Sequence, residues 1–193
     1  MNPAVRYQIK HFKTLKSTND KALIMARKGS PEGLVITADY QTQGRGREKK
    51  KWVSPRGWNL LFSILVRPQV KAHKAPLLTQ LAAQAVRKVL AALCPETLVK
   101  IKKPNDVLMN GKKICGILVE SSTQAGKIHF AVVGMGVNVL GKISAKIAGS
   151  TSIHEETGKK MKKKELLDGI LAFFSQKYAE NFQQDSEPLY NRN

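Results

Sequence analysis

The dipeptide Asn110-Gly111 lies between two apolar runs and constrains the fold more than any other feature of the sequence. Asn-Gly is the preferred pair for a two-residue β-hairpin turn, so residues 107–109 and 112–120 are predicted to pair as antiparallel strands. Another strand is predicted over 127–133, after a Gln-Ala-Gly turn. No helical segment separates these strands, whereas a parallel sheet needs a crossover between successive strands. The sequence therefore predicts an α+β fold with a mixed, mainly antiparallel central sheet and packed helices, rather than a doubly wound parallel sheet.

The rest of the chain supplies further strands and helices for this sheet. Residues 17–20, Ser-Thr-Asn-Asp, have the chemistry of a helix N-terminus and predict a helix of about ten residues after them. Short apolar runs predict buried strands over 34–38, 59–66 and 98–102, and helical apolar spacing predicts a helix over 76–93. Apolar residues at helical spacing also predict a C-terminal helix that includes Leu166, Leu167, Ile170, Leu171, Phe173, Phe174 and Tyr178. No linker divides the 193 residues, so we expect a single domain over 1–193.

The chain carries 33 Lys and Arg residues against 14 Asp and Glu residues. The excess is confined to residues 1–150, which hold 26 of the basic residues and 7 of the acidic ones. A field of this sign attracts polyanions such as nucleotides, nucleic acids or acidic proteins, although a lysine-rich solvated surface would look the same. No apolar run is long enough to cross a bilayer, and the N-terminus has no signal core, so a cytoplasmic protein without a membrane partner is expected. The two cysteines, Cys94 and Cys115, match no metal-ligand spacing and exclude a structural zinc site.

Residues 41–57 are predicted to form a loop, and this loop holds the most distinctive chemistry of the sequence. In the segment Gly44-Arg45-Gly46-Arg47, the glycines let the backbone approach an anion and the arginines donate to it. Lys50 and Lys51 add charge, and Trp52 adds a flat face for stacking. The segment is neither a Walker loop nor a dinucleotide fingerprint. Its chemistry resembles that of a phosphate or carboxylate clamp, although a basic Gly-Arg loop is more often a nucleic-acid-binding or solvated surface element.

Three further segments place polar or small residues at strand ends. Residues 102–106, Lys-Lys-Pro-Asn-Asp, end a strand at a proline turn, and Asn-Asp after proline is commonly only a turn. Lys113 begins the return strand of the predicted hairpin, where a lysine can face either solvent or the interior. Residues 134–138, Gly-Met-Gly-Val-Asn, are predicted to be a strand end. The alternative is a bulge or tight turn without a functional role.

In this order and spacing, these segments resemble the catalytic domain of biotin protein ligases. The resemblance runs from about Phe12 to Asn138 and comprises Ser17-Thr18-Asn19, the Gly44-Arg45-Gly46-Arg47 loop closing on Trp52, Lys102-x-Pro104-Asn105-Asp106, Lys113-x-x-Gly116-Ile117-Leu118-Val119-Glu120 and Gly134-x-Gly136-Val137-Asn138. It implies a fold related to class II aminoacyl-tRNA synthetases. It also implies MgATP-dependent formation of biotinyl-5′-AMP and transfer of biotin to one lysine of a biotin carboxyl carrier protein, the acetyl-CoA carboxylase subunit.

The resemblance also assigns roles to residues of this chain. The expected biotin site consists of Ser17, Thr18, Asn19, Gln41, Arg45, Gly46, Arg47, Lys113 and Gly116, and the expected ATP site of Arg47, Trp52, Lys102, Asn105, Lys113 and Asn138. The expected catalytic cations are Lys113, Arg45 and Arg47, which would screen the biotin carboxylate from the α-phosphate. No protein nucleophile is needed, because the substrate carboxylate attacks. ATP and biotin are expected as substrates together with Mg²⁺, whose ligands the sequence does not identify.

Two departures from the family pattern affect the nucleotide site. Lys103 stands where many members have Trp, and Lys50 stands where an arginine is common, which keeps the charge but loses the bidentate fork. No helix-turn-helix module is expected before Tyr7, so DNA binding of a repressor kind is not predicted. The small C-terminal β-barrel of many relatives is expected to be absent or truncated. A lipoate ligase or acyltransferase and a basic nucleic-acid-binding module remain as alternatives, and either a monomer or a homodimer fits the sequence.

Overall fold

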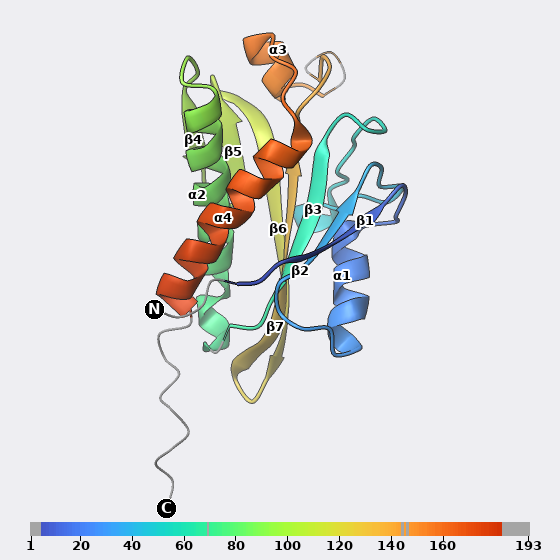
Figure 1. Cartoon of the computed structure of the whole chain (residues 1–193), viewed down its shortest axis with the longest axis vertical. Helices are drawn as coiled ribbons and strands as arrows, with labels where there is room; N and C mark the ends of the chain where they lie inside the picture. The colour runs from blue at the N-terminus through green and yellow to red at the C-terminus, as the bar shows by residue number, and fades with distance from the viewer. Residues whose placement is uncertain (1–4, 69, 144, 146, 183–193) are drawn as a thin grey trace, which may run out of the picture.

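A computed structural model describes residues 5–182, apart from residues 69, 144 and 146. Its centre is a seven-stranded sheet with the strand order β1-β2-β3-β7-β6-β5-β4 (Figure 1). Only β1 and β2 are parallel, and every other neighbouring pair is antiparallel. The strands are β1 (Gln8–Phe12), β2 (Leu34–Ala38), β3 (Leu60–Val66), β4 (Val99–Lys102), β5 (Asp106–Met109), β6 (Lys112–Gln124) and β7 (Lys127–Val137). The predicted mixed, mainly antiparallel sheet is confirmed.

Two of the hairpins of the sheet follow from their turn residues. Asn110 and Gly111 have φ values of 50° and 83°, and Ala125 and Gly126 have values of 49° and 75°. Two consecutive positive φ angles define the type I′ turn, which matches the twist of the strands on either side. The Asn-Gly turn therefore sets the pairing of β5 with β6, as predicted, and the second turn sets the pairing of β6 with β7.

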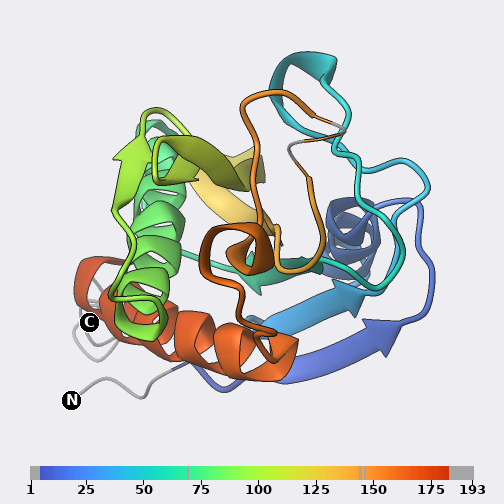
Figure 2. The ribbon, with the colours of Figure 1, turned by 90° about the horizontal axis from the view of Figure 1, so that it is seen from above.

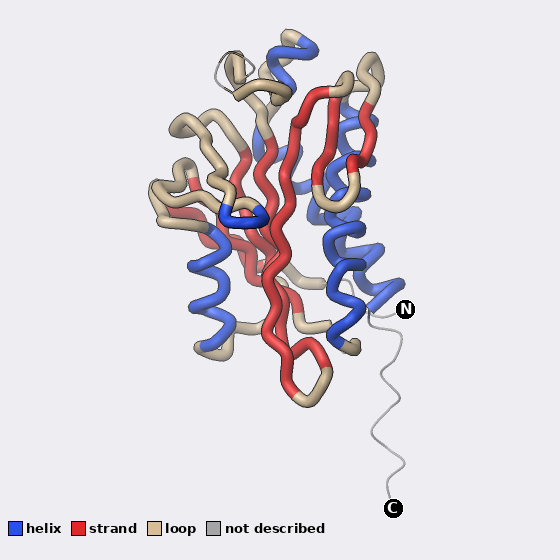
Figure 3. Tube along the Cα trace, turned by 180° about the vertical axis from the view of Figure 1, so that it is seen from behind, coloured by secondary structure: helices blue, strands red, loops and turns tan. Residues whose placement is uncertain are grey.

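Helices cover both faces of the sheet. On one face lie α2 (Ala75–Leu93) and α4 (Lys163–Phe182), and on the other lies α1 (Thr18–Arg27), which connects the parallel strands β1 and β2. Figure 2 shows the sheet between these two layers, and Figure 3 shows α1 from the opposite side. Shorter helices are η1 (Arg47–Lys49), η2 (Ala72–Lys74) and α3 (Ile153–Thr157). In the described part of the chain, no helix has the length and apolar character needed to span a membrane.

The core is divided by the sheet into two clusters. The larger cluster joins α2 and α4 to the sheet, and its fully buried side chains include Phe62, Leu78 and Phe174. The smaller cluster lies under α1 and includes Ala22, Ile36 and Phe130. Burial of such side chains stabilises each by roughly 1.5–3 kcal/mol relative to exposure. Both layers are thus fixed to the sheet, and the segment that precedes α1 is held close to the central strands.

Two elements differ from their predicted extents. β6 continues four residues beyond 120, and β7 continues from the predicted 127–133 to Val137. The predicted strand end at 134–138 is therefore paired strand up to Val137, and the alternative of a bulge or tight turn is wrong there. Gly134 and Gly136 carry no side chain to pack. Their backbone nevertheless pairs with β3 and β6, and the space above them is filled by other residues.

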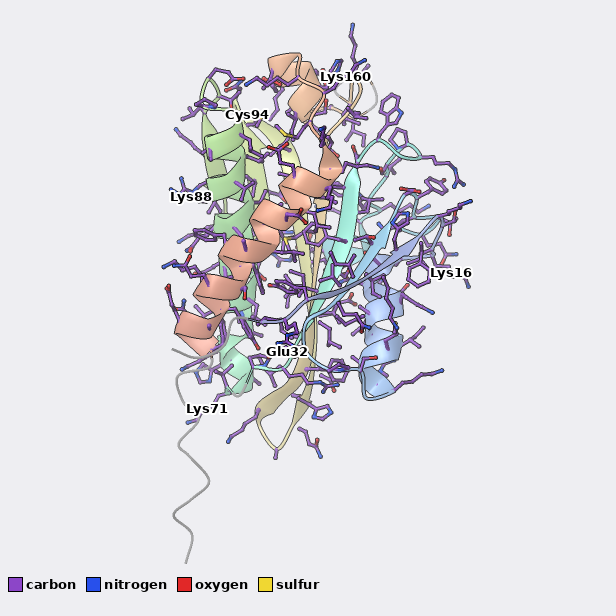
Figure 4. All side chains as sticks on the ribbon, in the orientation of Figure 1. Lys16, Glu32, Lys71, Lys88, Cys94 and Lys160 are labelled. Atoms are coloured by element: carbon purple, nitrogen blue, oxygen red, sulfur yellow. The ribbon has the colours of Figure 1, made fainter. Side chains whose placement is uncertain are left out.

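Exposed basic residues occur in several parts of the fold. The lysines labelled in Figure 4, Lys16, Lys71, Lys88 and Lys160, are exposed and belong to different parts of the fold. These four lysines contribute to the positive field of the chain from separate parts of the fold.

Candidate active site

Glycines on the two central strands make a flat floor on the face of the sheet that α1 covers. Gly116 of β6 pairs with Gly136 of β7, and a Cβ atom on either would lie 2.8 Å or 2.6 Å from the ring of Trp52. The Trp52 ring therefore rests directly on strand backbone. Two residues earlier on β7, a Cβ atom on Gly134 would lie 2.0 Å from Asn19 Oδ1. Any larger residue at these glycines would displace Trp52 or Asn19.

A hydrogen-bonded polar group forms one wall beside this floor. Gln41 Oε1 accepts from the Thr18 backbone N–H at 2.6 Å and from its hydroxyl at 3.0 Å. The fully buried Ser63 hydroxyl lies 2.8 Å from Thr18 Oγ1 and 2.6 Å from Asn19 Oδ1. Asn19 Nδ2 donates to Glu120 Oε2 at 2.8 Å. Buried polar groups fixed in this way keep one geometry, and the wall offers several donors and acceptors to a polar ligand.

The segment 44–52 is a closed hairpin above the floor. Its backbone bonds run from Gly46 N to Lys50 O at 2.7 Å and from Trp52 N to Gly44 O at 2.9 Å. A Cβ atom on Gly44 would lie 2.5 Å from the Trp52 carbonyl oxygen, so the closure requires a glycine there. Near the tip, Glu48 has a φ of 54° and lies 3.7 Å from the Lys50 ammonium group. The segment thus has internal order of its own.

Cations surround the same space. Lys113 Nζ lies 2.7 Å from Asp106 Oδ1 and 5.7 Å from the centroid of a Trp52 ring. Arg45 Nη2 contacts two carboxylates, Asp20 and Glu120. Arg47 forms no side-chain hydrogen bond or ion pair with any other described residue, although its side chain lines the cavity. The three cations therefore differ in how far their charge is already compensated.

These elements enclose a cavity of about 390 Å³. Its lining contains most of the residues that the sequence analysis selected, namely Thr18, Gln41, Arg45, Gly46, Arg47, Trp52, Asn105, Lys113 and Gly116. The motif residue Asp106 also lines it, together with Lys50 and Lys51 of the loop. The buried indole N–H of Trp52 has no hydrogen-bond partner among the described residues. A ligand in this space would meet positive charge, a flat ring and unused hydrogen-bonding groups.

Four of the selected residues lie outside the cavity lining. Ser17 caps α1 and accepts from the Asp20 backbone N–H at 3.4 Å, and Asn19 lies behind Gly134. Asn138 is buried and held on both sides, because it accepts from Asn59 and donates to the Thr151 carbonyl, both at 2.9 Å. Lys102 is exposed at the end of β4. These side chains shape the site from behind or stand at its margin.

Several residues of this cluster were absent from the sequence-based site, among them Asp106, which pairs with Lys113, and the three residues below. Ser63 was assigned only to a buried strand, but a hydroxyl in an otherwise apolar run is the signal that could have identified it. Glu120 was recognised as part of a motif without a role. Asp20 was assigned only to helix capping, whereas its carboxylate contacts Arg45.

Within the part of the chain that the structure describes, the site contains neither an activated cysteine nor a cluster of metal ligands. Cys115 is fully buried beside Gly116, and burial raises the pKa of its thiol far above the ordinary range, which disfavours the thiolate. No group of three or more His, Cys, Asp or Glu residues among the described residues could hold a metal ion. The cations in the cavity lining can bind, orient and electrostatically stabilise anions.

The fold is that of the class II aminoacyl-tRNA synthetase-like proteins, and solved structures of biotin protein ligases share it. The Aquifex aeolicus biotin protein ligase in complex with biotin and ATP superposes with a TM-score of 0.76 at 30% identity, over 91% of this chain and 73% of the other. The Leishmania major biotin protein ligase in complex with biotinyl-5-AMP superposes with a TM-score of 0.74 at 25% identity, over 91% of this chain and 76% of the other.

Sequence comparison leads to one family. The sequence pattern of the biotin/lipoate A/B protein ligase family matches residues 11–138, and the chain belongs to that family. The biotin--[acetyl-CoA-carboxylase] ligase of Paracoccus denitrificans is 36% identical over 91% of this chain and 75% of its own length. The bifunctional ligase/repressor BirA of Bacillus spizizenii is 34% identical over 91% of this chain, but only 55% of the BirA sequence is covered. The chain thus spans about half the length of that relative.

Proposed function

We propose that this protein is a biotin protein ligase, which makes biotinyl-5′-AMP from biotin and ATP and transfers the biotinyl group to a lysine of a biotin carboxyl carrier protein. The observation that carries the proposal is the cavity itself, where Lys113, Arg47 and Trp52 meet above a glycine floor beside a polar wall. The relatives support it, since one is named a biotin--[acetyl-CoA-carboxylase] ligase and two similar structures contain biotin with ATP or biotinyl-5-AMP.

In the first step, a carboxylate oxygen of biotin attacks the α-phosphorus of ATP. The bond between that phosphorus and the oxygen bridging to the β-phosphate breaks, and pyrophosphate leaves. Two anions must approach each other, so cations that lie beside the forming bond lower the barrier. Lys113 and Arg47 are assigned this role, because both line the cavity and neither is shared between two carboxylates.

The polar wall and the floor are assigned the task of orienting the substrates. The amide and hydroxyl groups of Gln41 and Thr18 suit a neutral polar ring such as the ureido group of biotin. Trp52 offers its face to a flat heterocycle. Asn105 also lines the cavity, and its side chain is held in place because it donates to the Ile117 carbonyl at 2.9 Å. Fixed substrates react with a smaller entropic cost.

In the second step, the neutral amine of the carrier lysine attacks the acyl carbon, and AMP leaves with the electrons of the acyl–oxygen bond. The amine nitrogen loses its proton to solvent as the amide forms. Mg²⁺ is expected to enter with ATP as part of the substrate, since it binds triphosphate oxygens and usually retains several waters. The positive field of the chain suits an acidic carrier domain.

Pyrophosphate release tests the proposed chemistry without any carrier. The protein is incubated with MgATP and either biotin or lipoate, and we expect release with biotin only. Lipoate is the informative competitor, because the family includes lipoate ligases. Release with lipoate and not with biotin would refute the biotin assignment, and release with neither would refute the activation chemistry.

A further inference from the structure

We infer that Arg45 is a positioning residue in the ligase reaction proposed above, held by a clamp of two carboxylates, Asp20 and Glu120. In this role Arg45 fixes the hairpin 44–52 over the cavity and does not supply charge to the reacting phosphate. The inference rests on the proposed function for its kinetic consequences. Its structural consequence, the fixed hairpin, can be measured without any substrate.

The clamp joins three separate elements of the fold. Arg45 Nη2 lies 2.5 Å from Asp20 Oδ1 and 3.0 Å from Glu120 Oε2. Asp20 belongs to the first turn of α1, Glu120 to the middle of β6, and Arg45 to the hairpin. One guanidinium nitrogen therefore ties the hairpin both to the helix and to the sheet.

The carboxylate on the sheet side is itself fixed. Glu120 Oε2 also accepts from Asn19 Nδ2 at 2.8 Å, and Asn19 is only 4% exposed. The same Asn19 amide donates to the Leu118 carbonyl at 3.2 Å. Glu120 is thereby held in one orientation by the polar wall, so it serves as a rigid anchor for Arg45.

Fixing Arg45 fixes the rest of the hairpin. Arg45 is bridged to Lys51 across the hairpin, and the Gly46–Lys50 and Gly44–Trp52 backbone bonds close it on either side. These bonds make the segment move as one unit. The position of Arg45 therefore determines where Arg47 and Trp52 stand above the floor.

The charge balance argues against a direct catalytic role for Arg45. One positive group shared by two carboxylates leaves a local charge of minus one, so the cluster as a whole does not attract a phosphate. Lys113 is paired with a single carboxylate, and Arg47 with no described residue. If Arg45 served as a charge donor, removing its carboxylates would release its charge and speed the reaction, whereas a positioning role predicts a loss.

The kinetic test uses isosteric variants and a double-mutant cycle. Asp20→Asn combined with Glu120→Gln removes both charges, and the glutamine oxygen still accepts from Asn19. We expect kcat/KM for biotin-dependent pyrophosphate release to fall about tenfold, mostly through KM, the size expected of two partly exposed ion pairs. Arg45→Ala should lose a similar amount, and adding the carboxylate changes to it should lose nothing more.

The structural test is cleavage of the unliganded protein after Glu48 by a glutamate-specific protease. The double carboxylate variant and Arg45→Ala should both be cut faster there than the parent. Asp168→Asn is the matched control, because it breaks an ion pair with Lys164 within the surface of α4, and its cleavage and kinetics should match the parent.

Three results would overturn the clamp: a carboxylate variant as fast as the parent or faster, losses that add fully to that of Arg45→Ala, or unchanged cleavage after Glu48. If the parent itself releases no pyrophosphate with biotin, the proposed ligase function is refuted. The cleavage comparison still decides whether the carboxylates hold the hairpin.

Discussion

Replacing Lys113 with alanine should leave a folded protein that makes biotinyl-5′-AMP very slowly. The side chain is 32% exposed, and its ammonium group lies 2.7 Å from Asp106 Oδ1 at the cavity wall. Loss of one preorganised charge beside a reacting phosphate typically costs about 10²- to 10³-fold in rate, roughly 3–4 kcal/mol. The effect on stability is smaller, about 1 kcal/mol or less, because the ion pair is partly exposed to solvent.

The assay is pyrophosphate release with biotin and MgATP, with circular dichroism to establish that the variant is folded. Lys112→Ala is the matched control. Lys112 also pairs with a carboxylate, Glu156 at 3.2 Å, but lies outside the cavity lining, as the alternation of side chains along a strand predicts. The control should therefore keep most of its activity. The reasoning is refuted if Lys113→Ala releases pyrophosphate as fast as the parent, or if Lys112→Ala is the slower of the two variants.

Three further predictions concern the glycine floor, the Trp52 ring and the positive charge of the chain. Gly134→Ala should lower the free energy of unfolding by about 1–3 kcal/mol, because its Cβ would meet Asn19 at 2.0 Å; an unchanged melting temperature would contradict this contact. Biotin with ATP should change the intrinsic fluorescence of the protein, and Trp52→Phe, which leaves Trp58 as the remaining tryptophan, should abolish most of the change. Transfer to an acidic carrier domain should slow as salt is added, while adenylate formation stays constant; a transfer rate independent of ionic strength would remove the steering role of the field.

Much of the fold was predictable because local rules and tertiary packing agree in it. The Asn110-Gly111 turn has the two positive φ angles that an Asn-Gly hairpin needs, and the α1 cap at Ser17 forms where the sequence predicts a helix start. The order of strands and helices then restricts the sheet to a mixed arrangement. Elements with strong turn or cap chemistry were thus placed within a few residues.

The last residues of β7 were only partly predicted, for a physical reason. Glycine normally weakens a strand, so the strand was predicted over 127–133 and residues 134–138 were predicted to be its end, with a bulge or tight turn as the alternative. Here the missing side chains are replaced by groups from elsewhere in the chain, Asn19 over Gly134 and Trp52 over Gly136. Such a contact joins residues more than 80 positions apart and leaves no signal in a local pattern.

The contacts between carboxylates and cations could likewise not be predicted from the sequence. The loop predicts cations, and Arg45 and Arg47 look equivalent within it. Only the fold brings Asp20 and Glu120 to Arg45 and leaves Arg47 without such a partner among the described residues. The internal bonds of the hairpin were also unexpected, because the loop has few apolar residues.

The most direct test of the proposed function is the intact mass of a biotin carboxyl carrier domain after incubation with this protein, biotin and MgATP. We predict that the carrier gains the mass of one biotinyl group, that the gain maps to a single lysine, and that it disappears when either biotin or ATP is omitted. A carrier whose mass stays unchanged while the protein releases pyrophosphate would contradict the transfer step, and a carrier modified without ATP would contradict the adenylate route.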